Sequence, residues 1–119
     1  MAESTWKDYR EKKKSKPLPL KGIRVLEVCT LLMGPSGPGM LSRLGAEVIK
    51  CEMPPLGDTL RSLSPFGYFF REQSTSFIRP NPNKYWLGLD LHKPEGQQVF
   101  RELAAKADVI EENQRPGVM

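Results

Sequence analysis

The chain has 119 residues, of which 39% are hydrophobic and 27% are charged. This length suits one domain with a small core, and the apolar content is too high for a generically disordered chain. No run approaches the roughly 20 consecutive apolar residues of a membrane-spanning helix, and the first residues lack the apolar region of a secretory signal. Two cysteines, Cys29 and Cys51, exclude a disulfide scaffold or a four-cysteine zinc site. We therefore expect a cytoplasmic protein without a metal.

The net charge of +4 comes from the N-terminal residues. Residues 1–21 contain seven Lys or Arg and three Asp or Glu, whereas residues 22–119 contain eleven of each kind. The lysines among residues 12–16 are of a kind that contacts nucleic acid or anionic membranes. No interleaved aromatic residues or recognition motif accompanies them. We therefore interpret residues 1–17 as a mobile basic extension, and we expect neither nucleic acid nor a membrane as a partner.

The sequence after this extension predicts a β-α-β unit. Residues 23–28 form a short segment rich in β-branched and other apolar side chains, which is typical of a buried strand. Residues 34–39 are rich in glycine and proline and predict a turn. A helix over residues 40–44 is expected to end at Gly45, and a second strand follows at 46–52.

The second half of residues 18–119 continues this alternation after a long interruption. Residues 53–82 contain several prolines and glycines and predict a loop, which at such length is typically functional or disordered. A third strand is expected at 86–91, then a helix from Pro94, and a fourth strand at 108–111. Such units pair their strands in parallel, and ligands bind beyond the carboxyl ends of the strands. Because a loop follows the last strand, we expect this chain to be the front part of a larger protein.

The glycine-rich segment after the first strand suggests one specific chemistry. Its pattern is G-x-x-G-x-G, and Glu52 closes the second strand, where a dinucleotide-binding fold places its ribose-binding carboxylate. Pro35 and Pro38 remove backbone N–H groups that would cradle a pyrophosphate. We therefore favour a tight structural turn, with a nicotinamide-dinucleotide-binding dehydrogenase domain as the alternative.

The sequence contains no recognisable catalytic constellation. His92 is its only histidine, so a Ser-His-Asp triad cannot be inferred. The two cysteines follow or end predicted strands, and we interpret them as buried free thiols.

Several ordered motifs resemble the opening of the family III CoA-transferases, the group of formyl-CoA transferase, carnitine CoA-transferase and the 2-methylacyl-CoA racemases. The matching segments lie within residues 18–119 and are 20–27, 34–35, 44–52, 57–61, 83–84, 89–91, 94–96, 107–109 and 112–119. The resemblance implies an α/β fold with a Rossmann-like parallel sheet and flanking helices, here the N-terminal part of the family's large domain. It also implies coenzyme A as part of an acyl-CoA substrate, a carboxylic acid as acceptor, and an interlocked homodimer for the full-length protein.

Members of this family use an aspartate that forms a mixed anhydride, which divides a difficult acyl transfer into easier steps. The resemblance places that aspartate beyond Met119, so no catalytic residue is assigned and the chain alone is expected to be inactive. A non-catalytic CoA-binding fragment is therefore a further alternative.

The resemblance also implies which residues contact CoA. Leu32 stands where formyl-CoA transferase has glutamine, which favours a more apolar acyl group than oxalate. The motif Gly57-Asp58-x-x-Arg61 favours the transferase branch over the racemases. The expected CoA contacts are Leu32, Met33, Met53, Leu89, Asp90, Leu91, His92, Asn113, Gln114 and Arg115.

Overall fold

The computed structural model describes residues 18–65 and 67–119, so the predicted extension at 1–17 lies outside the described residues. The elements in chain order are β1 (Arg24–Val28), α2 (Met33–Arg43), β2 (Glu47–Glu52), the 3-10 helix η1 (Thr59–Arg61), β3 (Phe69–Phe70), β4 (Gln73–Ser74), α3 (Thr75–Ile78), β5 (Lys84–Gly88), α4 (Pro94–Ala104) and β6 (Val109–Glu112).

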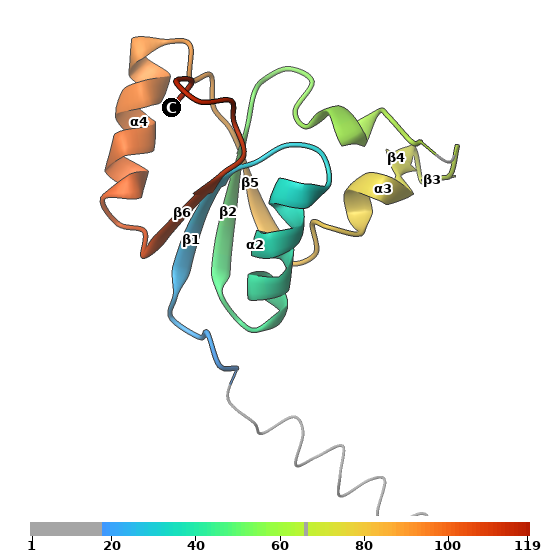
Figure 1. Ribbon diagram of the computed structural model, residues 1–119, viewed down its shortest axis with the longest axis horizontal. Coiled ribbons are helices and arrows are strands. Elements are labelled where there is room, and N and C mark those ends of the chain that lie inside the picture. Colours follow the sequence, from blue (N-terminus) through green and yellow to red (C-terminus); the bar gives the residue numbers. More distant parts are fainter. Residues whose placement is uncertain (1–17, 66) are drawn as a thin grey trace, which may run out of the picture.

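Four parallel strands form the central sheet in the order β5-β2-β1-β6 (Figure 1). Leu26 of β1 lies level with Ile49 of β2 and Ile110 of β6, so strands distant in sequence share one register. All four strands therefore have their carboxyl ends at one edge. The predicted α/β architecture with a parallel sheet is confirmed.

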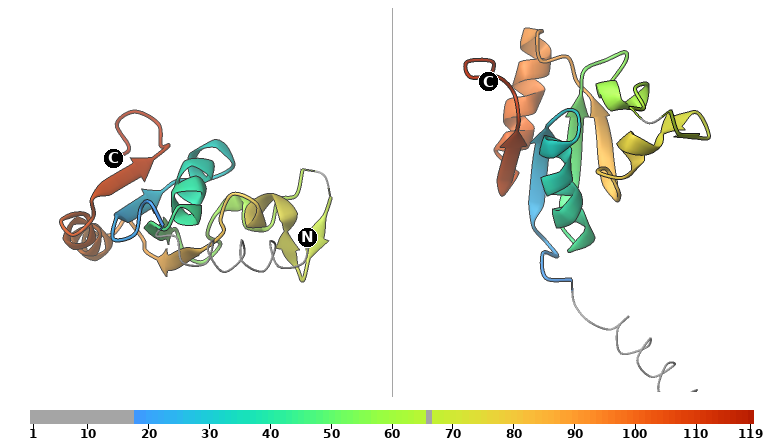
Figure 2. Two further views of the ribbon diagram at one scale, coloured as in Figure 1. Left: turned by 90° about the horizontal axis from the view of Figure 1, so that it is seen from below. Right: turned by 45° about the vertical axis from the view of Figure 1, so that its right-hand side comes forward.

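The helices α2 and α4 cover opposite faces of this sheet, as both views in Figure 2 show. Successive residues of a strand point to opposite faces. Val25 accordingly packs towards Leu41 of α2, whereas Leu26 packs towards Phe100 of α4. The core on the α4 side is the larger one and also contains Val28, Cys51, Leu87 and Leu103.

The prediction of a turn at residues 34–39 was wrong, because these residues form the first turns of α2. Proline is tolerated in a first turn, where the missing N–H would have no partner, and this accommodates Pro35. Pro38 lies further inside the helix and is buried. The small residue Gly39 allows α2 to approach the Pro80 carbonyl group closely. Tertiary packing thus outweighs the poor helix propensity of this segment.

The helix ends as predicted, with Gly45 at φ +103°.

Residues 53–82 are also more structured than the predicted loop. They contain η1, α3 and the β3–β4 hairpin, and they bury Leu60 and Phe77. The side chains of Asp58 and Ser74 cap η1 and α3, respectively.

The strand boundaries also differ from the prediction, because β5 ends at Gly88 and β6 begins at Val109. None of the helices in the two described ranges is long and apolar enough to cross a membrane.

We predict that Gly39→Ala destabilises the fold by about 1–3 kcal/mol, the usual cost of overpacking, although alanine is the better helix former. A Cβ at this position would collide with the Pro80 carbonyl oxygen, which belongs to the backbone and cannot rotate away. Urea unfolding measures the loss. Gly88→Ala is the control, since its Cβ would meet only Pro54 Cγ at 3.6 Å. Equal effects of the two substitutions would contradict this packing.

Candidate functional site

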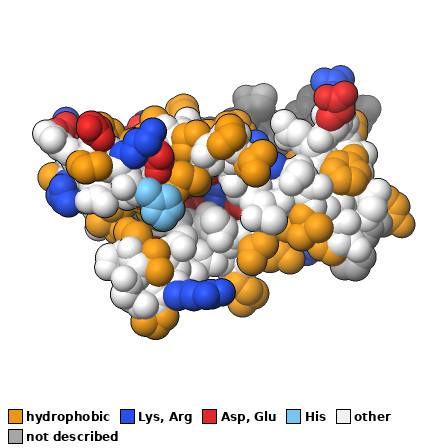
Figure 3. Space-filling model, turned by 90° about the horizontal axis from the view of Figure 1, so that it is seen from above, with side chains coloured by type: hydrophobic (Ala, Val, Ile, Leu, Met, Phe, Trp, Pro, Cys, Tyr) orange, Lys and Arg blue, Asp and Glu red, His pale blue; other side chains and the backbone are white. Residues whose placement is uncertain are grey.

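A cavity of about 340 Å³ opens at the edge of the sheet where the strands have their carboxyl ends. Figure 3 looks onto this edge, and the pale blue histidine marks one side of the hollow. Four chain segments contribute its walls. The lining residues are Val28 and Thr30 at and after the end of β1; Cys51, Glu52, Met53, Gly57 and Asp58 at and after the end of β2; Leu89, Leu91 and His92 after β5; and Gln114, Val118 and Met119 after β6.

Five of the ten residues expected to contact CoA line this cavity. They are Met53, Leu89, Leu91, His92 and Gln114. Leu89 and Leu91 also pack against the core on the α4 side, so each serves both the fold and the cavity wall. The walls combine apolar side chains with polar groups, as small-molecule sites commonly do.

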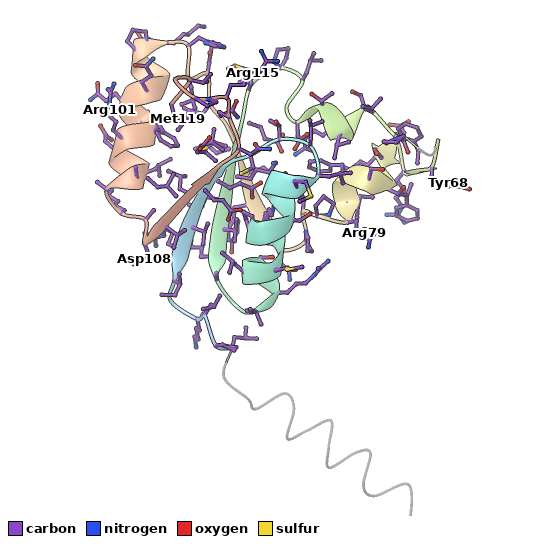
Figure 4. All side chains as sticks on the ribbon, viewed as in Figure 1. Tyr68, Arg79, Arg101, Asp108, Arg115 and Met119 are labelled. Carbon is purple, nitrogen blue, oxygen red and sulfur yellow. The ribbon has the colours of Figure 1, made fainter. Side chains whose placement is uncertain are left out.

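The other five expected residues do not line this cavity. Leu32 lies in a separate groove between α2 and residues 79–80, and Met33 is 88% exposed. Asp90 accepts the backbone N–H of His92 at 3.0 Å and thereby shapes the turn after β5. Arg115 follows β6 near Met119 at the same edge of the molecule (Figure 4).

The fifth of these residues, Asn113, ties two strand ends together. Its amide oxygen accepts the Thr30 backbone N–H, and its amide nitrogen donates to the Thr30 carbonyl, both at 2.9 Å. Gln114 adds a bond of 3.0 Å from its amide nitrogen to the Val28 carbonyl. The loops after β1 and β6 are therefore held in a fixed relation beside the cavity.

Four charged side chains lie buried beneath α2, and we call them the buried charge cluster: Glu27, Lys50, Asp58 and Lys84. All four side chains are 0% exposed. The Lys50 ammonium lies 2.9 Å from Glu27 Oε1 and 3.1 Å from Asp58 Oδ2. The Lys84 ammonium lies 2.7 Å from Glu27 Oε2. The two positive and two negative charges compensate one another, as buried charges require.

The lysines of the buried charge cluster also bind uncharged oxygens. Lys50 donates to the Cys29 carbonyl at 2.6 Å, and Lys84 donates to the Pro35 carbonyl and to Asn81 Oδ1, both at 2.8 Å. Glu27 Oε2 and Asp58 Oδ2 face their lysines without a well-aligned hydrogen bond among the described residues. Burial lowers the pKa of Lys84, and the Glu27 carboxylate opposes that shift.

Sequence reasoning did not identify this cluster. Glu27 and Lys50 each lie between apolar residues inside a strand, and they are partners in the β1–β2 register. A charged residue in a buried strand needs a compensating charge, so this pattern was the available signal.

Glu52 occupies the place of a ribose-binding carboxylate, but it has another partner. Its two oxygens lie 2.7 Å and 3.0 Å from nitrogens of the Arg61 guanidinium group. Arg61 in turn lies over the rings of Phe77 and Trp86, at 4.1 Å and 5.4 Å from their centroids. Such bidentate, stacked arginines are firmly held. This arrangement argues against a nicotinamide site at Glu52.

Neither thiol is suited to act as a nucleophile. Burial, assisted by Glu27 and Glu111, raises the pKa of Cys29 to about 12. Burial and the Glu27 charge raise the pKa of Cys51 to about 11. Because the thiolate is the reactive form, both are nearly inert at neutral pH. No group of three His, Cys, Asp or Glu side chains within 18–65 and 67–119 is placed to hold a metal ion.

The comparisons with known proteins agree with this fold. Residues 20–119 match the model of CoA-transferase family III. The chain is 42% identical over 99 residues to succinyl-CoA:glutarate CoA-transferase of Mus musculus, which covers 83% of this chain and 22% of that protein. It is 39% identical over 101 residues to acetyl-CoA:oxalate CoA-transferase of Acetobacter aceti, which covers 85% of this chain and 25% of that protein.

A solved structure shows the same arrangement. The crystal structure of a CAIB/BAIF family protein from Brucella suis superimposes with a TM-score of 0.77 at 35% identity, covering 86% of this chain and 27% of that one. The chain belongs to CoA-transferase family III, as its motifs suggested. It spans about a quarter of the length of the relatives named here.

We predict that both cysteines react slowly with iodoacetamide at pH 8 in the folded protein, because the pKa values of about 12 and 11 leave little thiolate. Mass spectrometry of quenched samples gives the rate for each cysteine. The same protein unfolded in urea is the control and should react much faster at both positions. Rapid labelling of Cys51 in the folded state would show that the cavity activates this thiol.

Proposed function

We propose that this chain supplies a CoA-binding part of an enzyme that transfers CoA from an acyl-CoA donor to a carboxylic acid. The match of residues 20–119 to the family carries this proposal. The cavity at the carboxyl edge of the sheet supports it, because open α/β sheets bind their ligands there. We also propose residues 18–119 as part of the large CoA-transferase domain, since the family match covers all but the first two of them.

The chemistry of the cavity suits a CoA molecule. Leu89, Leu91 and Met53 offer apolar surface to an adenine ring or a pantetheine chain. Arg115 is exposed at the same edge and carries a guanidinium group suited to phosphate oxygens. We infer acyl-CoA and a carboxylic acid as the substrates, as in the names of the two transferases compared above.

The alternative of a nicotinamide-binding domain receives no such support. Both oxygens of Glu52 are occupied by Arg61, and the glycine-rich segment is helical and contains two prolines. The other alternative, a fragment that binds CoA without catalysis, differs from the first proposal only in that the protein would not transfer CoA. The interlocked homodimer remains a prediction for the full-length protein.

We predict that the protein carrying this chain binds CoA and not NAD, and that Arg115→Ala weakens CoA binding by about 1–3 kcal/mol, the range for a hydrogen bond to a charged group. Calorimetric titration with both ligands measures this. Arg101→Ala is the matched control, because Arg101 lies on α4 outside the cavity lining and its guanidinium group donates to Gln97 of the same helix. Tight NAD binding, or equal effects of the two substitutions, would contradict the proposal.

We further predict that the 119-residue chain alone does not transfer CoA. The two carboxylates that line the cavity, Glu52 and Asp58, are engaged by Arg61 and Lys50 and are poorly placed to act as nucleophiles. A coupled assay with succinyl-CoA and a series of acceptor acids should show no turnover, while CoA binding is measured in parallel. Transfer at a measurable rate would show that a carboxylate within this chain is the nucleophile.

A further inference from the structure

Asp58 connects the buried charge cluster with the loop that follows β1. Its Oδ1 atom accepts the backbone N–H groups of Leu31 at 3.1 Å and Leu60 at 3.0 Å. Its Oδ2 atom faces the Lys50 ammonium at 3.1 Å. The side chain is fully buried and also contributes to the wall of the cavity. One carboxylate therefore contacts β2, η1 and the loop between β1 and α2.

The backbone of that loop needs such support. Leu31 has a φ of +66°, a left-handed conformation that side chains with a Cβ atom adopt at an energetic cost. Residues in this conformation persist where their surroundings fix them, and they gather at functional sites. The bond from the Leu31 N–H to Asp58 fixes this residue, and the amide group of Asn113 fixes its neighbour Thr30.

Lys50 holds Asp58 in place. Its ammonium group carries three N–H donors and has three oxygen neighbours, which are Glu27 Oε1, the Cys29 carbonyl and Asp58 Oδ2. The Cys29 carbonyl belongs to the loop, and Asp58 is the residue that supports the loop. Lys50 thus contacts Asp58, and Asp58 in turn contacts the loop backbone and lines the cavity.

We propose that Asp58 is a positioning residue, whose carboxylate, held by Lys50, fixes residues 29–33 in the shape that binds CoA. The identity of the ligand as CoA rests on the proposed function, whereas the role of Asp58 in fixing the loop does not. The Asp58–Lys50 ion pair is thereby given a role in binding, through the loop that it holds beside the cavity. A residue that only stabilised the fold would change the unfolding free energy without a specific effect on Leu31 or on affinity.

The test compares Asp58→Asn with Asp108→Asn in the protein that carries this chain. Asp108 is a matched control, because its Oδ2 accepts the Arg24 backbone N–H at 2.8 Å at the opposite end of the sheet (Figure 4). Amide hydrogen exchange at Leu31 and the dissociation constant for CoA are measured for both. We expect Asp58→Asn to speed exchange at Leu31 and to weaken CoA about tenfold, as for loss of a charged hydrogen bond. Asp108→Asn should speed exchange at Arg24 only.

Each outcome bears on the inference. Unchanged exchange at Leu31, or unchanged CoA affinity despite faster exchange, overturns it. If the unsubstituted protein does not bind CoA, the proposed function fails, and exchange at Leu31 alone decides whether Asp58 fixes the loop. If Asp58→Asn does not fold, a scalar coupling across the hydrogen bond between Leu31 N and Asp58 Cγ is sought in the unsubstituted protein. Its absence overturns the inference.

Discussion

Two lysines and two carboxylates lie between α2 and the sheet, and the surrounding elements meet at these four side chains. Glu27 lies in β1, Lys50 in β2 and Lys84 in β5, and Asp58 is the residue that caps η1. Removing one member would leave a buried charge without a partner, which typically costs about 3–5 kcal/mol. The register of three strands, the start of α2 and the path of the long connection after β2 are therefore fixed together.

The same cluster connects the interior with the edge of the sheet that forms the candidate site. Lys50 binds the Cys29 carbonyl, and Asp58 binds the N–H of Leu31. Asn113 then joins Thr30 to the segment after β6. Consecutive residues after β1 are thus held by partners distant in sequence. A cavity built from separate loops can keep one shape only if such cross-links exist, since loops are otherwise mobile.

The fold was predictable to the extent that local pattern determines it. The β-branched run that became β1 and the proline that begins α4 gave correct elements. The helical start of α2 was missed, because close packing of Gly39 against Pro80 outweighs local propensity. The pairing of Lys84 with Glu27 was missed because it joins residues 57 positions apart, and only the strand order, with β2 between β1 and β5, brings them together. For the candidate site, the resemblance named several cavity-lining residues as CoA contacts. It did not include Thr30, and it gave Asp58 only as part of the motif at 57–61, because the roles of both depend on loop geometry.

The most direct test is a crystal structure of the protein that carries this chain, determined with CoA. We expect electron density for CoA in the cavity at the carboxyl ends of the strands, in contact with Leu89 or Leu91 and with Gln114. We also expect Leu31 to keep its left-handed conformation, with its N–H donated to Asp58. Density for CoA at the opposite end of the sheet, near Asp108, with this cavity empty, would contradict the account.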